Sequence, residues 1–262
     1  MTCQRTTPIA VFDSGVGGIG VLREVKKLLP HEDLLYFGDD AMAPYGERST
    51  DEVQALVLHH AGLLLRSAKA LLLACNTATA AAAQALRQHY PNVPIIGMEP
   101  AIKPALKVAT HPRILILATP TTLREAKLRA LLRAHAAHAV FYKCPAPGLV
   151  RLVEAGLADS PEVDCYLDRI LAPFSGMHRP NAVVLGCTHF PFAKASILRH
   201  FGTDMPLFDG AEGTARELAR RLSVENLLNP TEHEGSITLT SSNPDMLPLY
   251  HKLFYASGEM GI

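Results

Sequence analysis

The sequence predicts an α/β protein of two pseudo-symmetric lobes, each a mainly parallel sheet flanked by helices, with an active site between them. Short apolar runs alternate along the chain with longer segments whose apolar residues recur at helical spacing, which is typical of a parallel sheet covered by helices. The alternation restarts after Met98. A short pattern around Cys75, "LLLACNT", also recurs around Cys187 as "VVLGCTH".

The first lobe is expected to begin with a strand, "IAVFD", that ends in the glycine-rich turn "SGVGGIG". Three further apolar runs predict the other strands, and the segments between them have helical periodicity. The helix expected over 50–67 carries a Thr/Asp cap and an acidic first turn. The expected strands are 9–13, 33–39, 69–75 and 93–98, and the expected helices are 20–29, 50–67 and 77–90.

The second lobe repeats this rhythm, and the tail reads as helix, strand and helix. We expect the tail to pack back onto the first lobe, which gives a first lobe of 1–98 with 211–262 and a second lobe of 99–210. The expected strands of the second lobe are 113–119, 139–145 and 181–187, its helices 122–136 and 165–174, and the tail elements lie within 211–222 and 235–254.

An internal duplication explains the repeated rhythm. Overlaying "IAVFDSGV" on "ILILATPT" places Asp13 and Ser14 opposite Ala118 and Thr119, and overlaying the two cysteine patterns places Cys75 opposite Cys187. The two overlays need nearly the same shift along the chain, as a diverged repeat would. Functional side chains are then expected at the carboxyl ends of the strands, where such lobes face each other.

Composition excludes several classes of protein. The chain has 262 residues, 48% hydrophobic and 19% charged, and its formal net charge is +0. That much apolar material can build a core, and no dense basic stripe suggests binding to nucleic acid or to a membrane surface. The first residues lack the apolar stretch of a signal peptide, and no apolar run is long enough to cross a bilayer, so a cytoplasmic location is expected.

The five cysteines do not form a recognisable metal or disulfide pattern. They lack the CxxC spacing of a zinc site and the even, dense set of a secreted disulfide framework, so no metal is expected. Cys3, Cys144 and Cys165 have no matching context and are interpreted as structural. Cys75 and Cys187 each stand where a strand gives way to a helix, and amide N–H groups at such a position favour a thiolate.

Other polar residues gather at the same predicted strand ends. Asp13 and Ser14 occupy the turn where a dinucleotide-binding GxGxxG would need bare backbone, so an ammonium ligand, a proton carrier or a simple capping turn are the alternatives. The triplet from Pro44 to Gly46 predicts a fixed loop, either a ligand cover or plain surface structure. Alone, each of these features is weak.

The residues beside the two cysteines suggest roles of their own. Asn76, Thr77 and Thr188 can donate hydrogen bonds to a carboxylate or a thiolate. His189 can serve as acid, base or packed ring, but its closeness to Cys187 in the chain does not make a dyad, because neighbouring side chains in extended structure point apart.

Six motifs together resemble those of the glutamate racemases, in the same order and across nearly the whole chain. They are "VFDSGVGG", "FGDDAMAPYG", "ACNTAT", "GMEPAIKPA", "VLGCTHFP" and "FDGAEGTA". The resemblance implies two α/β lobes related by a pseudo-twofold axis and cofactor-independent conversion of L-glutamate to D-glutamate for peptidoglycan. It also implies a homodimer.

The resemblance carries site residues over by motif. It makes Cys75 and Cys187 the catalytic acid/base pair, with Asp13 and His189 each assisting the cysteine on its own side. The matching substrate-binding positions are Asp13, Ser14, Tyr45, Gly46, Asn76, Thr77, Thr119, Glu154, Thr188 and His189. Before Glu154 the chain departs from the family, since the run from the Cys-Pro pair is longer and Arg151 stands where proline is expected.

A two-base racemisation would explain why the cysteine pattern occurs twice. One base removes the α-proton from one face, and the other delivers a proton to the opposite face. Three other functions remain open: an aspartate or other amino-acid racemase of the same plan, a cysteine hydrolase using Cys187 and His189, and a non-catalytic amino-acid-binding module. The hydrolase leaves Cys75 unexplained, and the binding module has no need of matched thiols.

Overall fold

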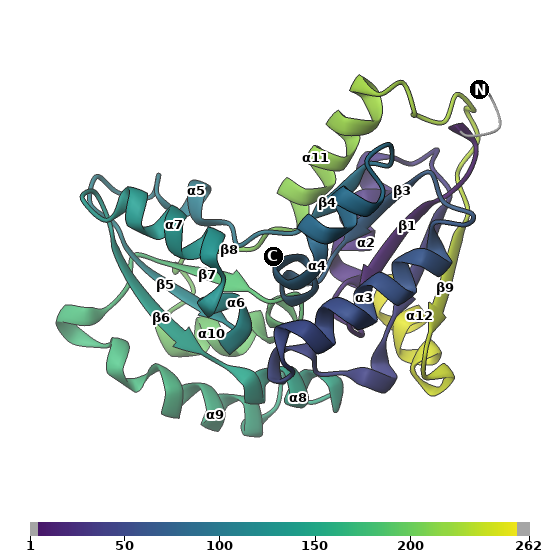
Figure 1. The fold of residues 1–262 in the computed structure, drawn as a ribbon. Coiled ribbons are helices and arrows are strands. Elements are labelled where there is room, and N and C mark those ends of the chain that lie inside the picture. Colours follow the sequence, from purple (N-terminus) through teal and green to yellow (C-terminus); the bar gives the residue numbers. More distant parts are fainter. Residues whose placement is uncertain (1–4, 256–262) are drawn as a thin grey trace. The chain divides into compact units, whose positions relative to one another are not determined.

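The computed structural model describes residues 5–255, which form two compact units (Figure 1). Among the described residues, one unit takes in 5–99 and 211–255, and the other takes in 100–210. Cys3 and the last residues of the expected first lobe lie outside the described residues. No helix between residues 5 and 255 is both long and apolar enough to span a membrane.

The first unit is built on a parallel sheet of five strands in the order β4-β3-β1-β2-β9. Its central strands, β1 and β3, are buried at every residue, because helices cover both faces. The strands are β1 (Ile9–Asp13), β2 (Leu34–Gly38), β3 (Ala70–Leu73), β4 (Ile95–Gly97) and β9 (Ile237–Ser241), and the helices are α2 (Ile19–Leu28), α3 (Thr50–Leu64), α4 (Asn76–His89), α11 (Ala211–Val224) and α12 (Leu247–Tyr255).

Alternate side chains along each strand point to opposite faces of this sheet, and each face packs into its own hydrophobic core. Ile9 and Val11 pack with residues of α2, α11 and α12, whereas Ala10 and Phe12 pack with residues of α3 and α4. Helix α3 begins differently from the prediction, because Ser49 rather than Thr50 or Asp51 is its cap. Ser49 forms a reciprocal capping box with Glu52.

The second unit is built on a parallel sheet of four strands in the order β6-β5-β7-β8. The helix expected over 122–136 is broken at Glu125, whose backbone leaves the helical region and whose side chain caps the second piece. The strands are β5 (Arg113–Ala118), β6 (Val140–Pro145), β7 (Ala182–Gly186) and β8 (Leu207–Phe208), and the helices are α5 (Ile102–Ala105), α6 (Pro120–Arg124), α7 (Ala126–His135), α8 (Pro147–Glu154), α9 (Pro161–Leu171) and α10 (Lys194–Phe201).

Short 3-10 turns connect several of these elements. They are η1 (Asp40–Met42), η2 (Tyr45–Glu47), η3 (Ala172–Phe174), η4 (Gly176–His178), η5 (Phe190–Ala193) and η6 (Pro244–Met246).

The two sheets share one strand order and one register, in agreement with an internal duplication. The order β4-β3-β1-β2 of the first unit corresponds to β8-β7-β5-β6 of the second. Phe12 pairs with Leu73 in the first sheet, and Leu117 pairs with Leu185 in the second. These are the residues that the sequence overlays superpose, so in each unit the cysteine stands two positions after the equivalent paired leucine, Leu73 or Leu185.

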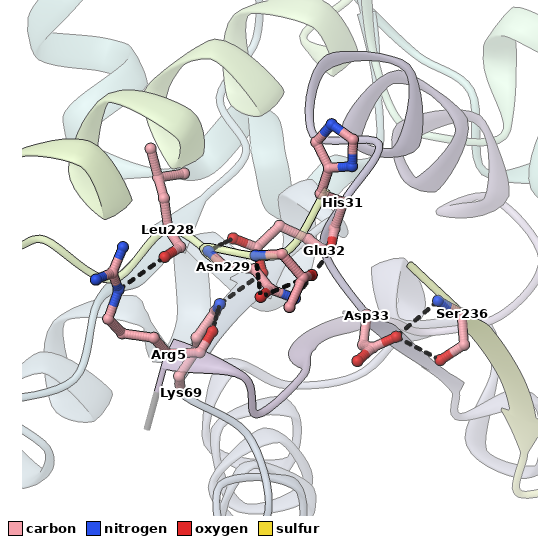
Figure 2. A network of polar contacts seen from close by, with 9 residues as sticks. Arg5, His31, Glu32, Asp33, Lys69, Leu228, Asn229 and Ser236 are labelled. Atoms are coloured by element: carbon pink, nitrogen blue, oxygen red, sulfur yellow. Dashed lines mark hydrogen bonds and ion pairs between the residues drawn. The ribbon is translucent and has the colours of Figure 1, made fainter. Parts of the chain in front are cut away.

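The tail adds β9 to the free edge of β2 in the first unit (Figure 1). A buried polar network, at the amino ends of the strands, ties the approach to β9 to the sheet (Figure 2). Lys69 Nζ donates to Glu32 Oε2 at 2.5 Å, and the other oxygen of Glu32 accepts from the backbone N–H of Asn229 at 2.8 Å. Burial lowers the pKa of Lys69 although Glu32 opposes the shift.

Candidate functional site

In the first unit, the ends of β1 and β3 bring Asp13, Ser14 and Cys75 together. The two strands are paired up to Phe12 and Leu73, so the residues that follow them leave the sheet at the same edge. Ser14 Oγ lies 3.4 Å from Cys75 Sγ, and both side chains are buried. Asp13 is fully buried, and its Oδ1 accepts a hydrogen bond from the Gly15 N–H at 2.9 Å.

Cys75 is also the N-cap of α4. Its backbone is extended, and its Sγ accepts a hydrogen bond from the Ala78 N–H at 3.4 Å. The free N–H groups and the dipole of a helix N-terminus favour a negative charge at this position. The thiol of Cys75 is therefore placed where its thiolate form is stabilised.

Asn76 follows Cys75 at the start of α4 and has an unsatisfied amide. Its side chain is 4% exposed, and neither its Nδ2 nor its Oδ1 has a hydrogen-bond partner among the described residues. A buried polar group without a partner costs about 1–3 kcal/mol. The amide is thus available for a polar ligand at this helix start, beside the buried Thr77.

Tyr45 and Gly46 are buried in the 3-10 turn η2, so of the two alternatives the plain surface structure is wrong. Tyr45 is buried, and its hydroxyl donates to Asp39 Oδ2 at 2.6 Å. His60 Nε2 lies 3.3 Å from the same oxygen. Burial acts to raise the pKa of Asp39, but hydrogen bonds from His60 and Tyr45 outweigh it and the pKa is lowered.

In the second unit, the chain turns directly after β7 and brings Cys187 and His189 together. Cys187 Sγ lies 3.8 Å from His189 Nδ1, and both side chains are buried. The expectation that these neighbours point apart is wrong, because the backbone of His189 is helical rather than extended. His189 precedes η5, and the next full helix, α10, begins only at Lys194.

Glu154 completes this cluster from the end of α8. Its Oε1 lies 3.2 Å from His189 Nε2, and its side chain is 20% exposed. The Glu154 carboxylate and the Cys187 thiol thus face the two ring nitrogens of His189 from opposite sides.

Two threonines of the predicted site are buried in the second unit. Thr119 is the N-cap of α6, and its Oγ1 accepts from the Thr122 N–H at 3.2 Å and lies 3.0 Å from Thr122 Oγ1. Thr188 is buried between Cys187 and His189. The first unit thus holds Asp13, Ser14, Tyr45, Gly46, Cys75, Asn76 and Thr77, and the second unit holds Thr119, Glu154, Cys187, Thr188 and His189.

The remaining described cysteines differ from one another. Cys144 is buried, and burial raises the pKa of its thiol to about 11, which suits a structural role. Cys165 is exposed, so it does not take the structural role expected of it. Across the part of the chain that the structure describes, no three His, Cys, Asp or Glu side chains are grouped to hold a metal ion.

The sequence reasoning missed Tyr36, Asp39 and His60. Asp39 follows β2 directly, as the predicted Asp13 ends β1, so its position at a strand end was a usable signal. Tyr36 and His60 lie within a strand and a helix and look like ordinary core residues. The polar contacts of Tyr36 with Gly15 and of His60 with Asp39 become visible only in the folded structure.

Comparisons with known proteins agree on one family. The model of the family "Asp/Glu/Hydantoin racemase" matches residues 20–218. The chain is similar to the glutamate racemase of Clostridium botulinum (40% identical, covering 97% of this chain and 99% of that one) and to that of Clostridium acetobutylicum (42% identical, covering 95% and 98%). The crystal structure of the glutamate racemase from Francisella tularensis in complex with D-glutamate superposes with a TM-score of 0.82, at 26% identity and covering 97% of this chain and 96% of that one.

Proposed function

The chain belongs to the Asp/Glu/hydantoin racemase family and is an amino-acid racemase, and we propose that it interconverts L-glutamate and D-glutamate with two cysteines as acid and base. The observation that carries the proposal is the repeated delivery of a buried thiol, Cys75 or Cys187, at equivalent strand ends of two matching sheets. Similarity to curated glutamate racemases over nearly the whole chain supports the choice of substrate.

Each turnover moves one proton off the α-carbon and one proton onto it. The thiolate of one cysteine takes the α-proton, which leaves the electron pair on the α-carbon and its carboxylate. The thiol of the other cysteine then gives its proton to the opposite face, so the two sulfur atoms exchange protonation states. The proposal requires that both sulfur atoms reach the α-carbon of one bound substrate.

Different groups assist the two thiols in this proposal. On the Cys75 side, the N-terminus of α4 and the Ser14 hydroxyl stabilise the thiolate, and Asp13 holds the substrate ammonium or adjusts the ionisation of the thiol. On the Cys187 side, His189 assists proton transfer, and Glu154 orients it.

Donors at the strand ends bind the substrate carboxylates. The unsatisfied amide of Asn76 suits one carboxylate oxygen, since a bound oxygen would satisfy a group that is otherwise buried without a partner. The remaining contacts are assigned by family motif to Ser14, Tyr45, Gly46, Thr77, Thr119 and Thr188. Excluding water strengthens these donors as charge develops on the α-carbon, so the reaction needs no cofactor.

The cellular role follows from the same proposal. A glutamate racemase supplies D-glutamate for peptidoglycan, and the resemblance to the family implies a cytoplasmic homodimer. Size measurement of the purified protein by light scattering checks the homodimer.

Loss of optical signal tests the activity directly. Purified protein is incubated with L-glutamate and no added cofactor, and circular dichroism follows the decay of the substrate signal to zero. In D2O, the product is expected to carry deuterium at its α-position, because the donating thiol has exchanged with solvent. Product that retains its α-hydrogen excludes the two-base mechanism, and faster turnover of L-aspartate than of L-glutamate excludes the substrate.

A further inference from the structure

Tyr36 lies behind the turn that carries Asp13 and Ser14. It is fully buried in the middle of β2, and its hydroxyl donates a hydrogen bond to the backbone oxygen of Gly15 at 2.6 Å. The N–H of the same Gly15 is held by Asp13 Oδ1 at 2.9 Å. Both backbone polar groups of Gly15 are therefore fixed, one by the phenol and one by the carboxylate.

Gly15 follows Ser14 directly in the chain, and Ser14 Oγ lies 3.4 Å from Cys75 Sγ. A short chain of contacts thus connects the phenol of Tyr36 to the turn, the hydroxyl of Ser14 and the thiol. A shift of the Gly15 peptide would move Ser14 and the Asp13 carboxylate together, because both are tied to it by bonds or by a hydrogen bond.

Two glycines leave the space that this arrangement needs. A Cβ at Gly18 would lie 2.8 Å from the Tyr36 hydroxyl and 2.6 Å from the Cβ of Asp13. A Cβ at Gly38 would lie 2.9 Å from the Gly15 oxygen. Real Cβ atoms do not approach so closely, so the phenol, the turn and the neighbouring backbone are in tight contact.

The C-terminal helix supports the phenol from behind. The ring of Tyr250, in α12, meets the Tyr36 ring edge to face with centroids 5.3 Å apart. The Tyr250 hydroxyl donates to Asp40 Oδ2, which also accepts from Ser241 Oγ at 2.5 Å. Two anchored tyrosines, Tyr36 and Tyr250, therefore connect α12 to the Asp13 turn.

The phenol of Tyr36 stays a hydrogen-bond donor over the working pH range. Burial raises its pKa well above the usual value, and the nearby Asp13 carboxylate adds to the shift. The hydrogen bond to Gly15 is therefore not lost by titration.

We propose that Tyr36 is a positioning residue that holds the Asp13–Gly15 turn against Cys75, with Tyr250 as its support. The role of Cys75 as an acid/base group rests on the proposed function. The chain of contacts from Tyr36 through Gly15 and Ser14 to the thiol does not, and its effect on the thiol can be measured without turnover.

The test is thiol reactivity in the Tyr36→Phe variant, which removes one hydroxyl and keeps the ring in the core. Alkylation of Cys75 and Cys187 by iodoacetamide is followed by mass spectrometry across pH, with Cys187 as the internal reference. We expect alkylation of Cys75 near neutral pH to slow about fivefold, the effect of one lost hydrogen bond, because the Ser14 hydroxyl no longer holds the thiolate. The Cys187 rate should not change.

Turnover supplies a second readout. The Tyr36→Phe variant should lower kcat about fivefold and raise KM, since the misplaced turn carries Ser14, which lies against Cys75, and also Asp13 and Ser14 as substrate contacts. The matched control is Tyr90→Phe, which makes the same change at the far end of α4 and should leave both readouts unchanged.

A folded Tyr36→Phe protein, shown by its circular dichroism spectrum and melting curve, with wild-type alkylation of Cys75 overturns the proposal. If the variant does not fold, Tyr250→Phe decides, because it loosens the support and keeps the hydroxyl of Tyr36. A smaller slowing of Cys75 alkylation then supports the proposal, and an unchanged rate overturns it. If Cys75→Ser retained racemase activity, the proposed function would fail, while the alkylation result would still decide the role of Tyr36.

Discussion

The end of β3 and the end of β7 present a cysteine at equivalent positions but with different partners. Cys75 accepts a hydrogen bond from the Ala78 N–H at the start of α4 and lies beside the hydroxyl of Ser14. Cys187 lies beside the His189 imidazole, whose Nε2 is 3.2 Å from the Glu154 carboxylate, and a 3-10 turn follows before the next helix begins. Strand order and register are the same in both sheets.

The difference shows which features of the repeat the proposed chemistry needs. Racemisation needs two proton carriers of similar acidity at one α-carbon, so the thiols and the strands that place them are the same. The ammonium, carboxylate and side chain of an amino acid give its two faces different neighbours. Distinct supports, a helix start for one thiol and a His–Glu pair for the other, are compatible with that asymmetry.

The largest expected effect comes from removing either thiol. We expect Cys75→Ser and Cys187→Ser each to lower racemisation by about 10³-fold, because a hydroxyl is a much weaker acid than a thiol and acid/base catalysis of this kind contributes about 10²–10⁴-fold. Steady-state circular dichroism measures the loss. The control is Cys165→Ser at an exposed position, which should turn over like the wild type. Near-normal turnover in either site variant would break the equivalence of the two strand ends.

A smaller effect is expected from neutralising the carboxylate of the second unit. The Glu154→Gln variant should lower kcat/KM about tenfold, because an amide holds the His189 ring but does not stabilise its cation. The pH profile of kcat/KM should change its shape on the side where His189 titrates. Asp168→Asn is the matched control, since Asp168 pairs with the partly exposed His200 at 2.8 Å. Equal losses in the two variants would contradict a specific role for Glu154.

Ser14 and Thr119 occupy equivalent positions and test the comparison most directly. Ser14→Ala should slow turnover about fivefold with little change in stability, because its hydroxyl lies against Cys75. Thr119→Ala should, unlike Ser14→Ala, also lower the free energy of unfolding by about 1 kcal/mol, because its hydroxyl caps α6. Urea titrations and rate measurements on both variants separate the two roles. Slower turnover with unchanged stability in both variants would show that the repeat kept one function for both hydroxyls.

The smallest expected effect is a pH dependence that belongs to the first unit. The pKa of Asp39 lies below its usual value of 3.8 in the folded chain, so its contribution to stability is present above that value and is lost as pH falls through the lowered one. The Asp39→Asn variant should therefore be less stable than the wild type at pH 6, and the difference should shrink at pH 3. Urea unfolding at both values measures it. Asp204→Asn, at an exposed position, is the control. An equal difference in the free energy of unfolding at pH 6 and pH 3 would contradict the lowered pKa of Asp39.

The sequence predicted every strand except the two-residue β8, because buried parallel strands read as apolar runs that end in abrupt polar residues, and β8 is too short for such a run. Contacts between particular side chains and local breaks in the backbone could not be predicted from the sequence. Ser49 displaced Thr50 as a cap through a reciprocal contact with Glu52, and Glu125 divided a helix that looks continuous in the sequence. The approach of His189 to Cys187 depends on a local turn that no periodicity encodes.

Strand β9 is made long after the sheet that it completes. A ribosome synthesises all of residues 100–210 and α11 before Ile237–Ser241 emerge, so the edge of β2 stays open throughout that interval. Tyr250 emerges later still, so the surroundings of the first thiol are complete only after β9 has been made. A nascent chain stalled before β9 would present an unpaired, aggregation-prone strand edge and a reactive centre without its last support.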